Sequence, residues 1–190
     1  IVLAALIHLP IRVIAGFGLL MIALHNLLDG FRAQSWRGPE TPVPGFGAKL
    51  WILLHQAFEA FPIVWFPSPI IFVIYPLVPW VGVMAVGYAF GALYQLNAQQ
   101  RRRLLLIIGG VATGLFIVMR AINVYGDPSE WSRQKNIVYT ALSFLNTTKY
   151  PPSLLFLLMT LGPSIIALAF FESSSSRGPI ARFFITFGRV

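Results

Sequence analysis

The chain has 190 residues, of which 57% are hydrophobic and only 11% are charged, and its mean hydropathy is +0.75. Soluble domains carry about 25% charged residues, so this composition indicates an integral membrane protein. The net charge of +8 is assigned to cationic residues that flank membrane spans, and nucleic-acid binding is rejected. The absence of cysteine excludes disulfides, thiolate metal sites and cysteine nucleophiles.

The first predicted elements are the tail of a helix and one complete span. Residues 1–9 are apolar, and we interpret them as the end of a helix that starts upstream, so we expect the chain to be part of a longer protein. Ile11–Leu28 follows as the first complete span, and the Gly- and Pro-rich residues 31–49 form a loop. Residues 50–61 have apolar side chains at helical spacing but are too few to cross a membrane, which predicts an amphipathic interfacial helix.

The second span is predicted over Ile70–Leu96, a stretch without a charged residue that is soon followed by three consecutive arginines. A hydrocarbon core ~30 Å thick needs about 20 apolar helical residues to cross it. Pro76 and Pro79 lie inside this stretch, so we expect the helix to kink or unwind near its start.

The third span is predicted over Leu104–Met119, directly after the arginines. Small residues let two helix backbones approach closely in lipid, so the glycines of this span predict a packing face. These glycines are Gly109, Gly110 and Gly114.

The last predicted elements are a long polar region and a fourth span. Residues 120–152 are expected to form a loop that contains a short helix over Ile137–Leu145. Ser153–Phe171 follows as the last complete span, and another span is expected to begin at Phe183.

Together these elements predict an all-α protein, a polytopic transmembrane helix bundle with about four complete spans and partial spans at both ends. Residues 1–190 are expected to form one transmembrane domain, in which 29–68 and 120–152 are extracytoplasmic loops with short interfacial helices. The short turns are almost purely cationic and the long loops carry both signs, so the positive-inside rule places the short turns in the cytoplasm.

Polar residues gather at the span ends that adjoin the two long loops. Ionisable groups at membrane depth are costly unless they are paired or hydrated, so we expect these residues to line a polar cavity that opens outward. The residues are His25, Asn26, Asp29, His55, Glu59, Arg120, Asn123, Tyr125, Asp127, Thr147, Thr148, Lys149 and Tyr150.

Several of these residues also have a simpler structural interpretation. His25 lies in the last turn of its helix, where an imidazole can cap carbonyl groups. Asp29 can be a helix terminator, His55 part of an amphipathic surface, and Arg120 a side chain that reaches lipid phosphate. Lys149 begins a span, where the helix dipole disfavours a cation, and this mismatch leaves a functional and a purely structural role equally open. The sequence has no phosphate-binding loop and no histidines and carboxylates at metal spacing, so no metal site is predicted.

Four strings occur in order: HNLLDG (His25–Gly30), YPLVPWVGVMAVGYAFG (Tyr75–Gly91), RAINVYGDP (Arg120–Pro128) and TKYPPSLLFLLMTLGP (Thr148–Pro163). Together they resemble a bacterial membrane family related to heparan-α-glucosaminide N-acetyltransferase. The resemblance implies a transmembrane acyltransferase, since the eukaryotic relative moves an acetyl group from cytoplasmic acetyl-CoA to a terminal glucosamine across the membrane. The family's Asp-Leu-Leu-Arg-Gly motif and the functional histidine after it do not occur in this sequence, so that role is not transferred to His25.

From this resemblance to the second half of such a protein, we expect an acyltransferase in a cell membrane, the bacterial inner membrane. Acetyl-CoA would be a co-substrate, with no permanently bound cofactor, and the acceptor would be an extracytoplasmic sugar, amino sugar or glycan. His25 is the candidate base or acceptor-positioning donor, and Asp29 would orient it. The candidate substrate-binding residues are Asn26, Arg120, Asn123, Tyr125, Lys149 and Tyr150.

Two other functions remain open at this point. A transporter or flippase for a polar lipid or glycan would use the charged cavity and the proline-broken second span equally well. In a non-catalytic structural membrane protein, the polar clusters would only cap helices.

Overall fold

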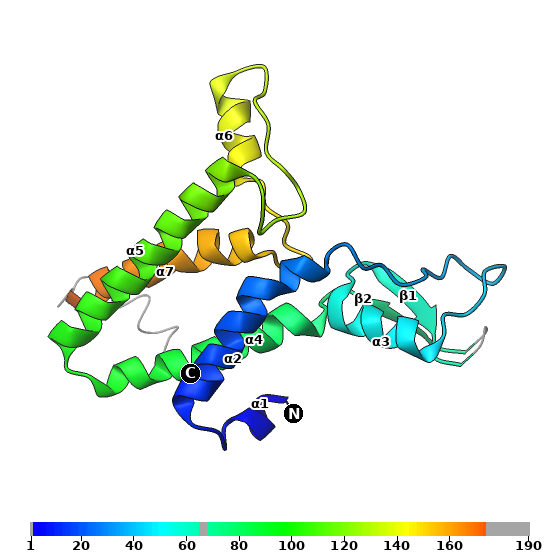
Figure 1. The fold of residues 1–190 in the computed structure, drawn as a ribbon, viewed down its shortest axis with the longest axis horizontal. Coiled ribbons are helices and arrows are strands. Elements are labelled where there is room, and N and C mark those ends of the chain that lie inside the picture. The colour runs from blue at the N-terminus through cyan, green and yellow to red at the C-terminus, as the bar shows by residue number, and fades with distance from the viewer. Residues whose placement is uncertain (1, 65–67, 174–190) are drawn as a thin grey trace, which may run out of the picture.

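The computed structural model describes residues 2–64 and 68–173, and the span expected from Phe183 lies outside them. Its elements are α1 (Val2–Leu6), α2 (Ile11–Leu24), the 3₁₀ turn η1 (His25–Leu28), α3 (Phe46–His55), β1 (Glu59–Pro62), β2 (Ile70–Val73), α4 (Leu77–Phe90), the 3₁₀ turn η2 (Gly91–Gln95), α5 (Ala98–Ile122), α6 (Ile137–Leu145) and α7 (Leu154–Ser173). Figure 1 shows their arrangement, with α6 projecting beyond the end of α5.

Four helical segments of the described residues are long and apolar enough to cross a membrane. They are Ile11–Leu28, Leu77–Gln95, Ala98–Ile122 and Leu154–Glu172. The all-α, multi-pass fold and its four complete spans are thereby confirmed. The third span starts earlier than predicted because the Asn97 side chain accepts a hydrogen bond from the Gln100 amide and caps α5 ahead of the arginines.

The second span begins later than predicted. Residues Ile70–Val73 form β2, and α4 starts only at Leu77. Pro76 precedes the helix and Pro79 lies in its first turn, where a missing amide hydrogen breaks no helical hydrogen bond. The expected unwinding near the prolines is confirmed, and the residues before them pair as a strand.

The interfacial helix lies earlier than predicted. α3 ends at His55, and β1 follows and pairs antiparallel with β2. Phe58 has a positive φ of 60°, which a right-handed helix does not allow, so the chain leaves the helical path there. This small module of α3 and two strands lies beside the spans in Figure 1. Its buried core consists of Trp36, Ile52, Phe61 and Val73.

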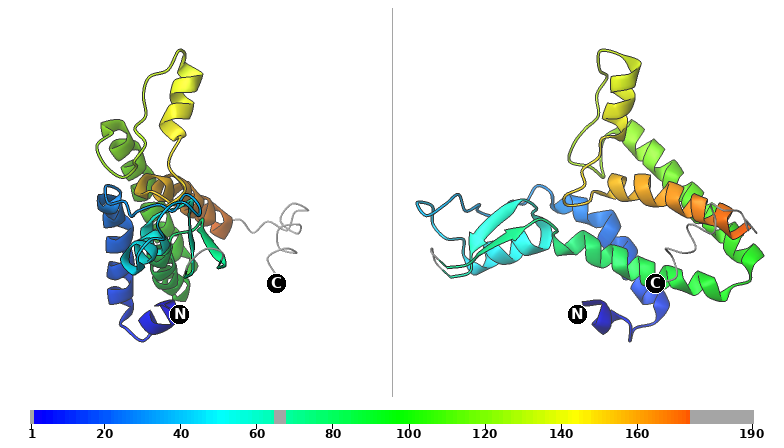
Figure 2. Two further views of the ribbon diagram at one scale, coloured as in Figure 1. Left: turned by 90° about the vertical axis from the view of Figure 1, so that its right-hand side faces the viewer. Right: turned by 180° about the vertical axis from the view of Figure 1, so that it is seen from behind.

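The spans pack as two helix pairs, α2 with α4 and α5 with α7 (Figure 2). In the first pair, a Cβ added at Gly18 would lie 2.8 Å from the Gly82 carbonyl oxygen. In the second pair, a Cβ added at Gly109 would lie 2.8 Å from the Gly162 carbonyl oxygen. Both pairs therefore require glycine where the two backbones come closest.

The face of small residues predicted in the third span is narrower than expected. Gly109 contacts α7, which confirms part of the prediction. An added Cβ at Gly110 or Gly114 would meet no atom within 4 Å. At 3.6 residues per turn, these two glycines point to other sides of α5 than Gly109 does.

Candidate functional site

The two helix pairs are joined by polar contacts near the end of the first span. A tyrosine hydroxyl, a backbone amide and an imidazole each reach from one pair to the other. The contacts join Tyr125 Oη to the Ala23 carbonyl oxygen (2.6 Å), the Leu154 amide to Asn26 Oδ1 (2.8 Å), and His25 Nε2 to the Pro152 carbonyl oxygen (2.9 Å). These contacts bring segments more than 100 residues apart to a single polar end of the molecule.

A cavity of about 390 Å³ lies at this end. Its polar lining comes from the end of the first span, from the α3–β1 region and from the two segments that flank α6. These polar residues are Asn26, Asp29, Arg32, His55, Gln56, Glu59, Ser129, Thr148 and Tyr150. The predicted convergence of polar span ends on one cavity is thereby confirmed for six residues of the predicted set.

Asp29 and His55 form the central pair of this cavity. The Asp29 carboxylate accepts a hydrogen bond from Asn26 Nδ2 at 2.7 Å, and its other oxygen lies 3.1 Å from His55 Nε2. A carboxylate can only accept, so Nε2 carries a proton, and in the neutral imidazole Nδ1 keeps a free lone pair. The His55 side chain is buried, at 3% exposed, and its Nδ1 makes no hydrogen bond to another described residue.

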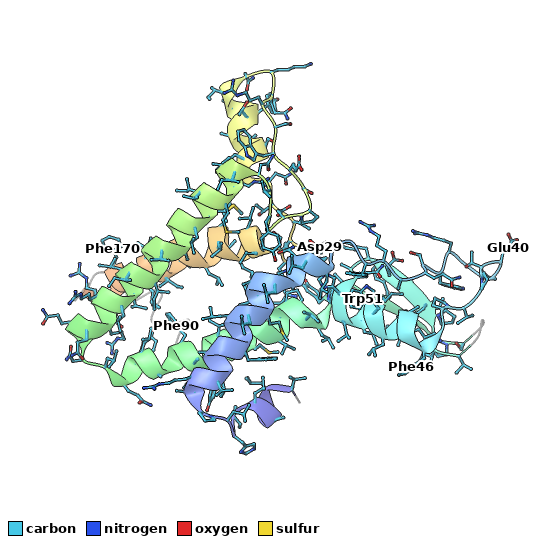
Figure 3. The ribbon with its side chains drawn as sticks, viewed as in Figure 1. Asp29, Glu40, Phe46, Trp51, Phe90 and Phe170 are labelled. Atoms are coloured by element: carbon cyan, nitrogen blue, oxygen red, sulfur yellow. The ribbon has the colours of Figure 1, made fainter. Side chains whose placement is uncertain are left out.

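This arrangement has the chemistry of a general base. A carboxylate that fixes the proton on one imidazole nitrogen leaves the other nitrogen able to accept a proton, and in this structure that nitrogen is closed to solvent. The Trp51 ring lies 5.5 Å from the His55 ring and covers one side of it. Figure 3 shows Asp29 at the end of the first span and Trp51 on the neighbouring α3.

His25 occupies a different environment, although its ring lies only 6.0 Å from that of His55. Its Nδ1 lies 2.8 Å from the Ile22 carbonyl oxygen and its Nε2 lies 2.9 Å from that of Pro152. Both ring nitrogens therefore face backbone carbonyls, and His25 ties the first span to the segment before α7. Asp29 is hydrogen-bonded to His55 and not to His25. The catalytic role predicted for His25 stays a prediction.

Arg120 does not line this cavity, although the sequence placed it in the substrate site. Its side chain is 1% exposed and donates hydrogen bonds to four backbone carbonyls. The acceptors are Ser129, Ser143, Phe144 and Asn146. Arg120 thus ties the end of α6 and the loop before it to the end of α5.

Asn123 and Tyr125 are likewise engaged with the backbone outside the cavity lining. Asn123 exchanges two hydrogen bonds with the backbone of Trp131, each 3.1 Å long. Burial raises the pKa of the Tyr125 phenol, and the negative charge of Asp29 raises it further. Both residues hold the wall of the site in place, and the substrate-binding role predicted for them stays a prediction.

Asn26 and Tyr150, by contrast, line the cavity as predicted. The Tyr150 hydroxyl lies 3.3 Å from the Tyr75 hydroxyl, and the Lys149 ammonium lies 5.1 Å from the Tyr150 ring. The hydrogen bond with Tyr75 lowers the pKa of Tyr150, and the contact with Lys149 lowers it further. The same hydrogen bond raises the pKa of Tyr75.

Asp127 was predicted to line the cavity but was given no catalytic or substrate-binding role, and the structure makes it a structural centre outside the cavity lining. Its carboxylate accepts hydrogen bonds from the Ser129 amide (2.8 Å), the Thr148 amide (2.7 Å) and the Thr148 hydroxyl (2.9 Å). A fourth bond comes from the Ser153 hydroxyl (2.6 Å). The signal in the sequence was an acidic residue between Gly126 and a proline at the end of a span. The sequence gave no such indication of the role of His55, because its partner Asp29 lies 26 residues away along the chain.

Comparison of the chain with models of known protein families, with curated proteins and with solved structures finds no match. Among the described residues, no three His, Asp or Glu side chains gather closely enough to hold a metal ion. Any functional assignment therefore depends on the geometry of the cavity and on the resemblance of the four strings.

Proposed function

We propose that this membrane protein is an acyltransferase whose cavity activates the acceptor, with His55 as the general base. The observation that carries the proposal is the His55–Asp29 pair, in which a buried imidazole has one nitrogen fixed by a carboxylate and the other unengaged. A polar cavity next to an apolar membrane region suits an acceptor that carries several hydroxyl groups. The resemblance to the N-acetyltransferase-related family supports the same reaction class.

In the proposed reaction, a hydroxyl or amine of a sugar acceptor attacks the carbonyl carbon of an acyl-CoA thioester, whose acyl end must reach the outward cavity from the cytoplasmic side. The new C–O or C–N bond forms as the C–S bond breaks, and CoA leaves as the thiolate. His55 Nδ1 is itself buried, so the side chains that cover it must first move aside to admit the acceptor. It then takes the proton from the attacking group and returns it to the thiolate sulfur, so charge and protons balance. Asp29 holds the imidazole in the required tautomer, and Asn26 holds Asp29.

Other cavity residues would position the acceptor. Glu59 accepts a hydrogen bond from the Ser35 hydroxyl at 2.9 Å and keeps a second carboxylate oxygen for an acceptor hydroxyl. Tyr150 offers a phenol from the same cavity lining, which Tyr75 and Lys149 hold in place. We propose that the free carboxylate oxygen of Glu59 and the Tyr150 phenol make the hydrogen bonds that orient the sugar.

The direct test is transfer of labelled acetyl from acetyl-CoA by the purified full-length protein to a panel of sugars, amino sugars and glycans. We expect transfer by the wild type and a loss of about 100-fold or more in His55→Gln, since a general base contributes at least that factor. His8→Gln is the matched control, because His8 is exposed and lies outside the cavity. Transfer by His55→Gln at the wild-type rate would refute the role of His55, and no transfer by the wild type to any acceptor would refute the acyltransferase.

One observation favours a second candidate, a transporter or flippase for a polar lipid or glycan. The two helix pairs are packed tightly within themselves, whereas the hydrogen bonds between them cluster at the cavity end. Such a joint suits rocking of one pair against the other, as in alternating access. A transporter needs no thioester, so binding of acetyl-CoA by the purified protein separates the two candidates.

A further inference from the structure

An apolar groove of about 570 Å³ lies beside the polar cavity. Its walls come from Leu28, at the end of the first span, and from Ala48 and Trp51 on α3. Phe31 and Arg32 line both the groove and the cavity, so the two spaces share one border. The molecule thus offers a continuous binding surface that is apolar at one end and polar at the other.

The groove lies among side chains that suit the membrane interface. Leu27, which precedes the groove residue Leu28 in the chain, is 61% exposed, and Phe46 at the start of α3 is 83% exposed. The Trp51 indole donates a hydrogen bond to the Phe31 carbonyl oxygen at 2.9 Å, which fixes the groove wall. Tryptophan is enriched where hydrocarbon meets headgroups. Figure 3 shows Phe46 and Trp51 on the same short helix, near Asp29.

Arg32 is the charged group at the border between groove and cavity. Within the described part of the chain it has neither a hydrogen bond nor an ion pair. The two cavity carboxylates have other partners, since Asp29 holds His55 and Glu59 holds Ser35. An unpaired guanidinium offers a planar fork of donors that matches a phosphate group.

We propose that the groove and the cavity together bind one membrane lipid that carries a phosphate. The hydrocarbon chain lies in the groove against Trp51, the phosphate lies beside Arg32, and the hydroxylated headgroup lies in the cavity near His55. The inference rests on the proposed function and deepens it, because it makes the acyl acceptor a lipid-borne headgroup. A free sugar would leave the groove and Arg32 without a role.

Fluorescence quenching of Trp51 tests the site without any catalysis. The protein is held in maltoside detergent, which carries no phosphate, and titrated with phosphatidylglycerol brominated on its acyl chains. The difference between the wild type and Trp51→Phe isolates the signal of Trp51 from those of the other tryptophans. Brominated diacylglycerol, which has the same chains and no phosphate, is the matched probe.

We expect Arg32→Gln to require about tenfold more brominated phosphatidylglycerol for half-maximal quenching, because one charge-assisted phosphate contact is lost. Arg37→Gln, an exposed arginine of the same loop outside the groove, should behave as the wild type. Diacylglycerol should quench Arg32→Gln and the wild type alike. Equal quenching by the two lipids in the wild type, or an equal loss in Arg37→Gln, would overturn the lipid site.

The acetyl-transfer assay, run with phosphatidylglycerol as a further acceptor beside the soluble sugars, separates this inference from the proposed function. Arg32-dependent quenching without any acetyl transfer would keep the lipid site and refute the enzyme. Transfer to a soluble sugar that depends on His55, together with quenching that ignores Arg32, would keep the enzyme and refute the lipid acceptor.

Discussion

The contacts inside each helix pair differ in kind from the contacts between the pairs. Inside the pairs, backbone meets backbone at Gly18 and Gly82 and at Gly109 and Gly162. Between the pairs, hydrogen bonds to backbone and side-chain groups gather at one end. In lipid, apolar surface gives helices little reason to associate, so close packing and polar contacts decide which helices meet. Here close packing forms the pairs, and polar contacts join them and build the cavity.

The largest loss of stability is expected from Arg120→Met, which removes hydrogen bonds at the polar end of the molecule and leaves the glycine contacts inside the helix pairs unchanged. Four backbone carbonyls would lose a charged donor, and we expect the free energy of unfolding to fall by about 3 kcal/mol. Thermal unfolding in detergent measures the change. Arg133→Met is the control, because Arg133 is exposed in the loop between α5 and α6. Equal midpoints for both variants would mean that Arg120 does not organise this end.

A smaller loss of stability is expected from Gly109→Leu, which disrupts the close backbone contact inside a helix pair. The new side chain would collide with the Gly162 carbonyl and with Ile166, and overpacking of this kind costs about 2 kcal/mol. Gly110→Leu is the matched control, since a Cβ there meets no atom within 4 Å. The same detergent melts compare them, and equal stability would contradict the predicted close contact of α5 with α7.

His25→Phe sharpens the comparison between two neighbouring histidines. It removes the contact with the Pro152 carbonyl between the helix pairs, so we expect about 1 kcal/mol less stability and a largely preserved rate of transfer. For His55→Gln we expect the opposite result, a large loss of the transfer rate and a smaller change in stability. A variant of His25 that melts like the wild type but no longer transfers acetyl would assign the base to His25, as the sequence predicted.

The smallest expected effect is a shift in the pKa of Tyr150, which is hydrogen-bonded to Tyr75. The hydrogen bond with Tyr75 lowers the pKa of Tyr150, so Tyr75→Phe should raise that pKa toward its ordinary value. The Tyr150 phenolate would then form at higher pH than in the wild type. Alkaline titration by ultraviolet absorbance, with Tyr150→Phe to assign the signal, measures the shift. Tyr139→Phe, which removes an exposed tyrosine of α6, should leave it unchanged.

Much of the fold could be predicted because its signals are local. The helix over Ile137–Leu145 has the predicted bounds, and the first span begins and ends as predicted when η1 is included. The strand Ile70–Val73 was missed because a short apolar run looks the same whether it is strand or helix. The helix predicted over residues 50–61 failed at Phe58, whose positive φ depends on the strand that follows.

The candidate site could be predicted only as a gathering of polar span ends. Asn26, Asp29, His55 and Tyr150 were placed correctly on the cavity, but the pairing of Asp29 with His55 was not predicted. Arg120 looked like an anion-binding group because the sequence does not show the four carbonyls around it. The sequence did not indicate that Phe31 and Arg32 lie between the groove and the cavity. The groove forms only when α3 packs beside them, and the sequence does not show that contact.

The sequence by itself determined that the protein lies in a lipid bilayer and how many complete spans it has. Hydropathy and length are properties of one helix at a time, so they can be judged without the tertiary structure. It also determined that the polar residues lie at span ends, since charges avoid the hydrocarbon core. Only the tertiary structure decided which helices pair, which histidine meets Asp29 and where the apolar groove joins the cavity. Those outcomes depend on distances of a few ångströms between atoms far apart along the chain, and no local pattern encodes them.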